Sequence, residues 1–135
     1  MQTLKAIFKH GNVVAIKDSE DDKKRLDKIL SLAKGTHVSV LTGKEMFVRH
    51  CLMKGGRGSV TSLGNVVPSW IAAIQKESEN GNCRESLKWQ KKFDALFHDI
   101  FEGSLQMPTL ARYTWMLKIF LAERGICGLH AFDVS

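Results

Sequence analysis

The stretch Val13-Val14-Ala15-Ile16-Lys17-Asp18-Ser19 decides the fold class of this chain of 135 residues. The apolar run that opens it is typical of a parallel strand covered on both faces. Lys17 closes the run. An ammonium group at the end of a buried strand usually has no use there unless it takes part in a reaction. A neutral lysine amine can attack a carbonyl carbon and form a Schiff base; the alternative is a solvent-facing lysine that ends a strand. Lys17 is therefore the first candidate catalytic residue.

Helix and strand patterns alternate from this stretch to residue 81. Two short apolar segments are typical of strands, a third short strand is predicted after a group of glycines, and a segment with helical spacing follows each of the three. The three predicted strands are, in chain order, residues 13–17, 38–41 and 59–62. The signals that open the following helices are S-x-x-D at Ser19 and Asp22, a T-x-x-E capping box at Thr42 and Glu45, and Pro68. Three βα units in succession predict an α/β fold with a parallel sheet and right-handed crossovers.

Polar or glycine positions follow each of the predicted strands. Lys17, Thr42-Gly43 and Ser62 all fall at the carboxyl end of a strand. In parallel sheets and barrels the active site lies at these ends. We therefore expect the three positions to converge on one functional site.

The last third of the chain has a different pattern. Large apolar residues recur there at helical spacing, in Phe93, Leu96, Phe97, Ile100 and Phe101. A further helix is predicted from Pro108 to Gly125. The change of pattern predicts a βα part over residues 1–82 and a C-terminal helical extension over residues 83–135.

Composition and charge limit the classes of partner. Lys and Arg number 20 and Asp and Glu number 14, for a net charge of +6. A basic chain raises nucleic-acid binding as an option, but the densest positive clusters lie beside acids in helical patterns. Three widely spaced cysteines and five dispersed histidines form no metal-ligand pattern, and no apolar run approaches the length of about 18 residues that a membrane span needs. We expect a cytoplasmic protein with reduced thiols that binds no nucleic acid, membrane or metal.

A glycine-rich segment, Gly55-Gly56-Arg57-Gly58-Ser59-Val60-Thr61-Ser62-Leu63-Gly64-Asn65, surrounds the third predicted strand. Backbone N–H groups in such segments can bind phosphate. The segment lacks the Walker lysine pattern and the dinucleotide-binding glycine spacing. From the pattern alone, we favour glycines that stop one helix and allow a tight turn into a strand.

Three motifs in register resemble a known family. They are Ile16-Lys17-Asp18-Ser19, Leu41-Thr42-Gly43 and the pattern G-x-x-G-x-V-x-S-x-x-N that begins at Gly55. Their order and spacing are similar to those of the dihydrodipicolinate synthase / N-acetylneuraminate lyase family, over most of residues 4–102. The resemblance implies a class I aldolase fold, a (β/α)8 TIM barrel, of which these three βα units are similar to strands six to eight.

The resemblance also implies roles for five residues. Lys17 would form the Schiff base with pyruvate or with the pyruvate half of a 2-keto acid. Gly43 would place its backbone at the substrate, and Val60 would present backbone to the keto acid with Ser62 beside it. Glu45 falls where sialic-acid-type members use an acid on the polyol tail. The first substrates to test are those of dihydrodipicolinate synthesis and of 2-keto-3-deoxy sugar-acid cleavage, with no cofactor.

The length of the chain is short for this fold. A (β/α)8 barrel needs about 250 residues and eight strands, whereas three strands are predicted here. In the family, the threonine pair that binds the pyruvate carboxylate and the tyrosine that relays protons lie upstream of the lysine. Neither has a counterpart here, since Tyr113 is the only tyrosine and is predicted to pack on a helix face. We expect a truncated product, half of a split enzyme or a rearranged domain, with little or no lyase activity alone.

Three classes of function therefore stay open. The preferred one is Schiff-base aldol chemistry through Lys17. The main alternative is a non-catalytic interaction or assembly module, in which a homo-oligomer or a complementing chain supplies the other strands. A basic nucleic-acid binder is the third, and strong salt dependence of binding would support it.

Overall fold

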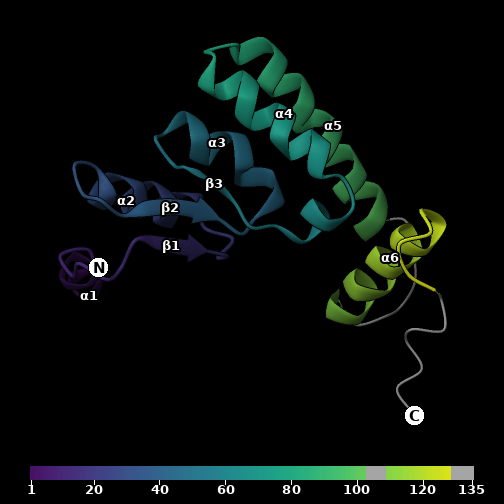
Figure 1. The fold of residues 1–135 in the computed structure, drawn as a ribbon, viewed down its shortest axis with the longest axis horizontal. Coiled ribbons are helices and arrows are strands. Elements are labelled where there is room, and N and C mark those ends of the chain that lie inside the picture. The colour runs from purple at the N-terminus through teal and green to yellow at the C-terminus, as the bar shows by residue number, and fades with distance from the viewer. Residues whose placement is uncertain (103–108, 129–135) are drawn as a thin grey trace.

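The structure, a computed structural model, describes residues 1–102 and 109–128, and the side chains of residues 100–113 lie outside its description. The predicted packing of Ile100, Phe101, Leu110 and Tyr113 is therefore outside the described residues. The elements (Figure 1) are α1 (Gln2–Ile7), β1 (Ala15–Asp18), α2 (Lys23–Ala33), β2 (Ser39–Thr42), η1 (Glu45–Phe47), α3 (Val48–Met53), β3 (Gly58–Ser59), η2 (Ser62–Asn65), α4 (Pro68–Glu79), α5 (Cys83–Glu102) and α6 (Thr109–Glu123), where η marks a 3-10 helix.

The strands form one parallel sheet in the order β1-β2-β3, as the three βα units predict. Asp18 at the end of β1 lies beside Thr42 at the end of β2, and Thr42 lies beside Ser59 at the end of β3. The carboxyl ends of the three strands are thus level with one another. This register brings the segments that follow them to one edge of the sheet.

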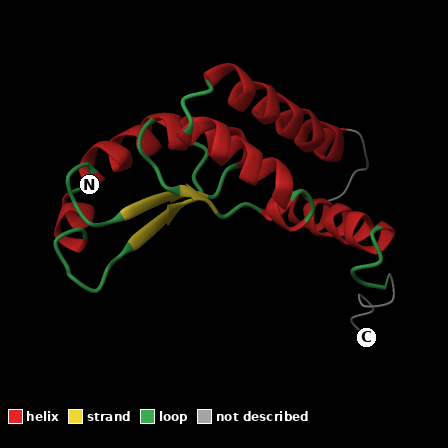
Figure 2. Cartoon of the chain, turned by 45° about the horizontal axis from the view of Figure 1, so that its top comes forward, coloured by secondary structure: helices red, strands yellow, loops and turns green. Residues whose placement is uncertain are grey.

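Helices lie over one face of the sheet and leave the other face open (Figure 2). The core between them joins α2, β2 and α3. Its buried members are Phe8, Leu26, Ile29, Leu30, Ala33, Val38, Val40 and Cys51. The helical spacing of the apolar residues in α2 predicts this face correctly.

A second core holds α4 and α5 against the segments beside the sheet. It contains Val48, Leu63, Val66, Val67, Ile74 and Phe93. Phe93 of α5 is fully buried there, in contact with a cluster that begins in α3 and η2. α5 therefore shares a core with the βα units. The division into residues 1–82 and 83–135 stays a prediction.

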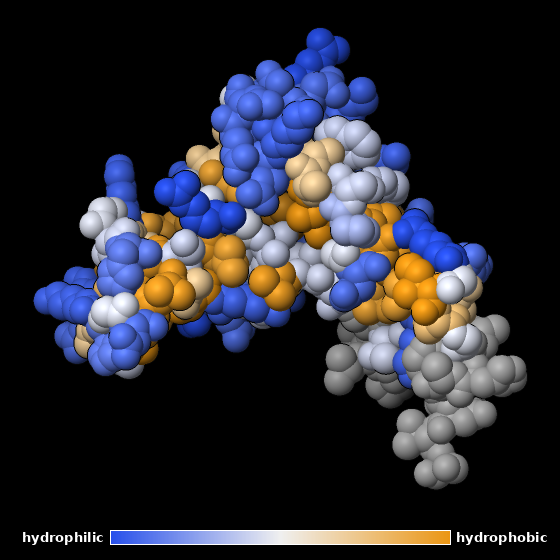
Figure 3. Space-filling model, in the orientation of Figure 1, coloured by the Kyte–Doolittle hydropathy of each residue, from blue (hydrophilic) through white to orange (hydrophobic). Residues whose placement is uncertain are grey.

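The prediction that the first strand is covered on both faces is wrong. Val14 is 66% exposed, and Ala15 and Lys17 are also exposed. Apolar side chains reach the visible surface over the strands (Figure 3). The unbroken apolar run suggested two-sided burial, but no described element covers the second face of β1.

Two helix starts differ from the predicted ones. Asp22, not Ser19, is the N-cap of α2, and its carboxylate accepts a hydrogen bond from the Arg25 N–H at 3.0 Å. The predicted capping box is also absent, because the Thr42 hydroxyl accepts from the Lys44 N–H at 3.1 Å and so closes a local turn. A short 3-10 helix, η1, begins there instead of a continuous α-helix. The third strand is shorter than predicted, because η2 begins at Ser62.

Candidate active site at the carboxyl ends of the strands

Lys17 and Gly43 meet at the carboxyl end of the sheet. Lys17 lies on β1 beside Leu41 of β2, and Gly43 directly follows β2. A Cβ atom built on Gly43 would lie 2.5 Å from Cε of Lys17 and would collide with the side chain of Ser19. A side chain at position 43 would therefore occupy space that the lysine needs. The structure brings these two predicted site residues together.

The backbone after β2 and before η2 is fixed by the ends of the neighbouring strands. The Gly43 N–H donates to the Asp18 carbonyl oxygen at 2.7 Å, and the Val60 N–H donates to the Thr42 carbonyl oxygen at 2.8 Å. Each bond extends the strand pairing by one residue. Gly43 therefore directly follows β2 and Val60 directly follows β3, with both N–H groups already bonded.

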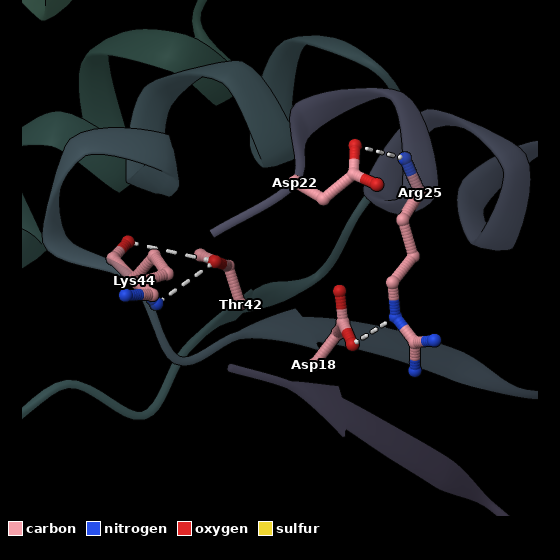
Figure 4. A network of polar contacts seen from close by, with 5 residues as sticks. All are labelled: Asp18, Asp22, Arg25, Thr42 and Lys44. Atoms are coloured by element: carbon pink, nitrogen blue, oxygen red, sulfur yellow. Dashed lines mark hydrogen bonds and ion pairs between the residues drawn. The ribbon is translucent and has the colours of Figure 1, made fainter. Parts of the chain in front are cut away.

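Asp18 and Thr42 support the site from the helix-covered face (Figure 4). Asp18 is 5% exposed, and its Oδ1 accepts from Nε of Arg25 at 3.0 Å. This hydrogen bond raises the pKa of the Arg25 guanidinium. Because residues alternate between the faces of a strand, Asp18 points away from the face that carries Lys17. Arg25 thereby ties the start of α2 to the end of β1.

Glu45 and Ser62 also lie close together, but in an arrangement that differs from the predicted substrate contact. Glu45 is buried, and its Oε1 accepts from the N–H groups of Ser62 at 3.1 Å and Leu63 at 3.5 Å. A carboxylate at the start of a 3-10 helix satisfies N–H groups that have no partner within the helix. Glu45 thus contacts the segment that carries Ser62, while a contact to a substrate's polyol tail stays a prediction.

The surroundings of Lys17 are more open than the sequence suggests. Its side chain lies on the exposed face, and no described carboxylate is within ion-pair distance of it. The apolar run of residues 13–16 therefore does not bury the amine in this chain. The geometry places a lysine amine beside a glycine at the end of a parallel sheet, on a face that no described element covers.

Three features of the site escaped the sequence prediction. Ser19 contacts the Gly43 position, although the sequence marks Ser19 only as a helix start. Arg25 binds Asp18, which lies within the quoted stretch but carried no predicted role. Gln90 of α5 donates to the Glu45 carbonyl oxygen at 2.9 Å, and no signal in the sequence marks this glutamine as buried.

The described residues hold neither a metal site nor a membrane-spanning helix. No group of three or more His, Cys, Asp or Glu side chains gathers there in a way that could hold a metal ion. Among the described helices, none has both the length and the apolar character needed to cross a membrane. Cys51, Cys83 and Cys127 are free thiols, and burial raises the pKa of Cys51 to about 11.

The family model of the dihydrodipicolinate synthetase family matches residues 1–118, which include every predicted site residue. The chain belongs to the dihydrodipicolinate synthetase family. The observed α/β fold of parallel strands and helices agrees with this membership. The three motifs around Lys17, Gly43 and Gly55 identified this family correctly.

Individual members of the dihydrodipicolinate synthetase family are similar over most of this chain. The 4-hydroxy-tetrahydrodipicolinate synthase of Syntrophus aciditrophicus is 27% identical over 118 residues, which are 87% of this chain and 40% of that protein. The structure of dihydrodipicolinate synthase from Bacteroides thetaiotaomicron matches with a TM-score of 0.84 and 23% identity, over 93% of this chain and 42% of that one. A prophage protein of the dihydrodipicolinic acid synthase family from E. coli K12, solved with pyruvate, matches with a TM-score of 0.67 and 19% identity, over 93% and 51%. This chain therefore spans about 40% of the length of the curated relatives that it matches.

Proposed function

We propose that Lys17 is the Schiff-base nucleophile of a class I aldolase that acts on pyruvate or another 2-keto acid. The observation that carries the proposal is the contact between Lys17 and Gly43 at the carboxyl end of the sheet. Glycine leaves room for a lysine side chain and for a small ligand at the same point. Family membership supports the same class of chemistry.

The chemistry follows from the amine and its neighbours. The neutral Lys17 amine adds to the keto carbon, C2, and loss of water leaves a C2 iminium. In cleavage the electron pair of the C3–C4 bond moves into the C2–C3 bond to form an enamine, and the C4 hydroxyl gives up its proton as C4 becomes the aldehyde carbon. Condensation is the reverse of this step. Because the N–H groups of Gly43 and Val60 are bonded within the sheet, these residues would offer carbonyl oxygens, which can accept from the carbinolamine hydroxyl or from the iminium N–H. Ser62 would supply a hydroxyl beside them.

Complete turnover needs more polypeptide than the described part of this chain supplies. We propose that residues 1–82 form strands six to eight of a (β/α)8 barrel and that residues 83–135 form its C-terminal helical extension. Five further strands would cover the open face that carries Lys17, and burial there would favour the neutral amine. We expect little lyase activity from residues 1–135 alone. Two free, exposed or half-buried thiols, Cys83 and Cys127, support a reducing, cytoplasmic location.

The substrate beyond pyruvate has two candidates. The similarity to 4-hydroxy-tetrahydrodipicolinate synthases supports a condensation of that kind. The alternative is cleavage of a 2-keto-3-deoxy sugar acid, for which Glu45 would be the acid on the polyol tail. The bonds from Glu45 to the backbone of η2 favour the first candidate.

Reductive trapping tests the nucleophile directly. The chain is incubated with pyruvate and sodium borohydride, whose hydride reduces the iminium carbon to a stable secondary amine. Intact mass should show one adduct, and peptide mapping should place it on Lys17. Lys17→Ala should abolish the adduct, while Lys34→Ala, which removes an exposed lysine elsewhere, should leave it unchanged.

A second variant tests the contact that carries the proposal. Gly43→Ala should displace the Lys17 side chain and lower the adduct yield at a fixed pyruvate concentration by about tenfold. Absence of an adduct on the wild-type chain would refute Schiff-base competence. An adduct that persists in Lys17→Ala would move the nucleophile to another lysine.

A specific observation also favours the assembly alternative. The outer edges of β1 and β3 have no strand partner among the described residues, and the face beside them is open. Open edges and exposed apolar surface favour association with further strands. Light scattering after size exclusion should show an oligomer, or a complex with a co-expressed complementing chain. A stable monomer whose β1 amides exchange rapidly with deuterium would count against this function.

A further inference from the structure

We propose that Gln90 and Glu45 are positioning residues that hold the loop between β3 and η2 in place at the carboxyl end of the sheet, the end at which Lys17 also lies. This loop carries Val60 and the start of η2 at Ser62. The inference rests on the proposed function, since it assigns the two side chains to the same site. It gives the helical extension a role in substrate binding that neither the motifs nor the family membership assigns.

Gln90 is the anchor of this arrangement. It lies on α5, is 5% exposed, and uses both ends of its side-chain amide. Its Oε1 accepts from the Arg49 N–H at 2.8 Å, at the start of α3. Its Nε2 donates to the Glu45 carbonyl oxygen at 2.9 Å and to Oδ1 of Asp94 at 2.7 Å. Because the amide has donors and an acceptor engaged on different elements, its orientation is fixed.

Glu45 carries the connection from Gln90 to the site. Its backbone is held by Gln90, and its carboxylate accepts from the N–H groups of Ser62 and Leu63. Hydrogen bonds to a charged acceptor are stronger than those between neutral groups. The position of Ser62 therefore depends on Glu45, and the position of Glu45 depends on α5.

A second contact holds α5 at the same place. Nε of Arg49 donates to Oγ of Ser86 at 3.0 Å, and Ser86 is fully buried. The start of α3 is thus bonded to α5 through both its backbone and its side chain. Burying a glutamine amide or a carboxylate costs free energy unless its polar atoms are hydrogen-bonded. If the interface served packing alone, apolar side chains would serve equally well. The polar contacts fix the position of α5 relative to the start of α3 and to Glu45. Through Glu45 they also fix the loop between β3 and η2.

Hydrogen–deuterium exchange tests the connection without any substrate. Glu45→Ala and Gln90→Met should each speed exchange at the Ser62 and Leu63 amides by about tenfold or more, with little change in α2. Glu45→Gln keeps an acceptor oxygen in the same place and should restore most of the protection. Lys91→Met, an exposed neighbour of Gln90 on α5, is the control and should leave both amides unchanged. Unchanged exchange at Ser62 and Leu63 in Glu45→Ala and Gln90→Met would overturn the proposal.

Borohydride trapping tests the consequence for binding. In Glu45→Ala and Gln90→Met the pyruvate concentration that gives half-maximal adduct should rise about threefold or more, while the yield at saturation stays at the wild-type level because Lys17 is intact. A role of Glu45 in binding only a polyol tail would leave pyruvate trapping and amide exchange as in the wild type. If wild-type chain gives no adduct, the proposed function fails, and the exchange data still decide whether α5 holds the loop. If Glu45→Ala does not fold, Gln90→Met gives the same decision, with Lys91→Met as its control.

Discussion

The two faces of the sheet differ sharply in what surrounds them. On the helix-covered face, Val40 is 2% exposed and Thr42 is fully buried, whereas Ala15 and Lys17 on the other face are exposed. Neighbours in one strand therefore meet opposite environments, because side chains alternate between the faces. The difference teaches that the sheet is stabilised mainly by packing on its helix-covered face. The other face is left for chemistry and for contact with further strands.

A pair of matched substitutions is the most direct test of the difference in burial between the two faces. Leu26→Ala empties a position in the covered core that is 1% exposed, and should lower the free energy of unfolding by about 2 to 5 kcal/mol. Leu41→Ala removes the same atoms from a partly exposed position on the open side, and should cost about 1 kcal/mol or less. Urea denaturation followed by circular dichroism measures both. Equal losses would show that the open face is covered in solution.

The thiol behind β2 offers a second measurement on the covered side. Cys51 is fully buried, its Sγ contacts the Val40 carbonyl oxygen at 3.8 Å, and burial raises its pKa from 9.0 to about 11. In the unfolded chain the thiol loses its proton first as the pH rises. The stability that this difference provides is complete below pH 9 and is lost progressively toward pH 11.

We therefore expect the free energy of unfolding of the wild type to fall by about 2 kcal/mol more than that of Cys51→Ala between these two pH values. The comparison uses the change in the free energy of unfolding with pH, not its absolute value. The cost of the cavity that the substitution leaves therefore cancels. Parallel pH profiles for the two proteins would show that water reaches the back of β2.

The N-cap of α2 provides a third comparison, in which the expected losses of stability are smaller. Asp22→Ala removes the carboxylate that accepts from the Arg25 N–H, and should cost about 1 kcal/mol. Ser19→Ala changes the residue that the sequence pattern marks as the helix start, and should cost less than about 0.5 kcal/mol. Thermal melts of the two variants rank the positions. A larger loss for Ser19 would assign the start of α2 to that residue.

The sequence predicts the covered side of this molecule better than the open side. Apolar periodicity in α2 locates its buried face, and the short apolar segments of β1 and β2 locate these two strands, because both follow from local spacing. The same run in β1 suggested burial on both faces, since a sequence pattern does not tell which surfaces meet further polypeptide. Val14, at 66% exposed, is the residue that shows this limit.

The candidate site also contains residues that the sequence predicts and residues that it does not. Lys17 and Gly43 could be predicted to converge, because parallel strands bring their carboxyl ends to one edge. Gln90 could not, since its partners Arg49 and Glu45 lie 41 and 45 residues away. Nothing in an amphipathic helix distinguishes a buried glutamine from an exposed one. The Thr42 and Glu45 pattern misled for a related reason: Glu45 binds the backbone of a later segment that local spacing does not reveal.

The smallest effect on stability is expected at the residue with the largest effect on chemistry. Lys17→Ala should change the free energy of unfolding by less than about 0.5 kcal/mol, because the side chain is exposed and has no ion pair among the described residues. The same substitution should remove the pyruvate adduct completely. Urea denaturation and borohydride trapping on one preparation separate the two quantities. A loss of stability well above 1 kcal/mol would place Lys17 in a packed environment, and the open face would then have to be covered by association of the chain itself.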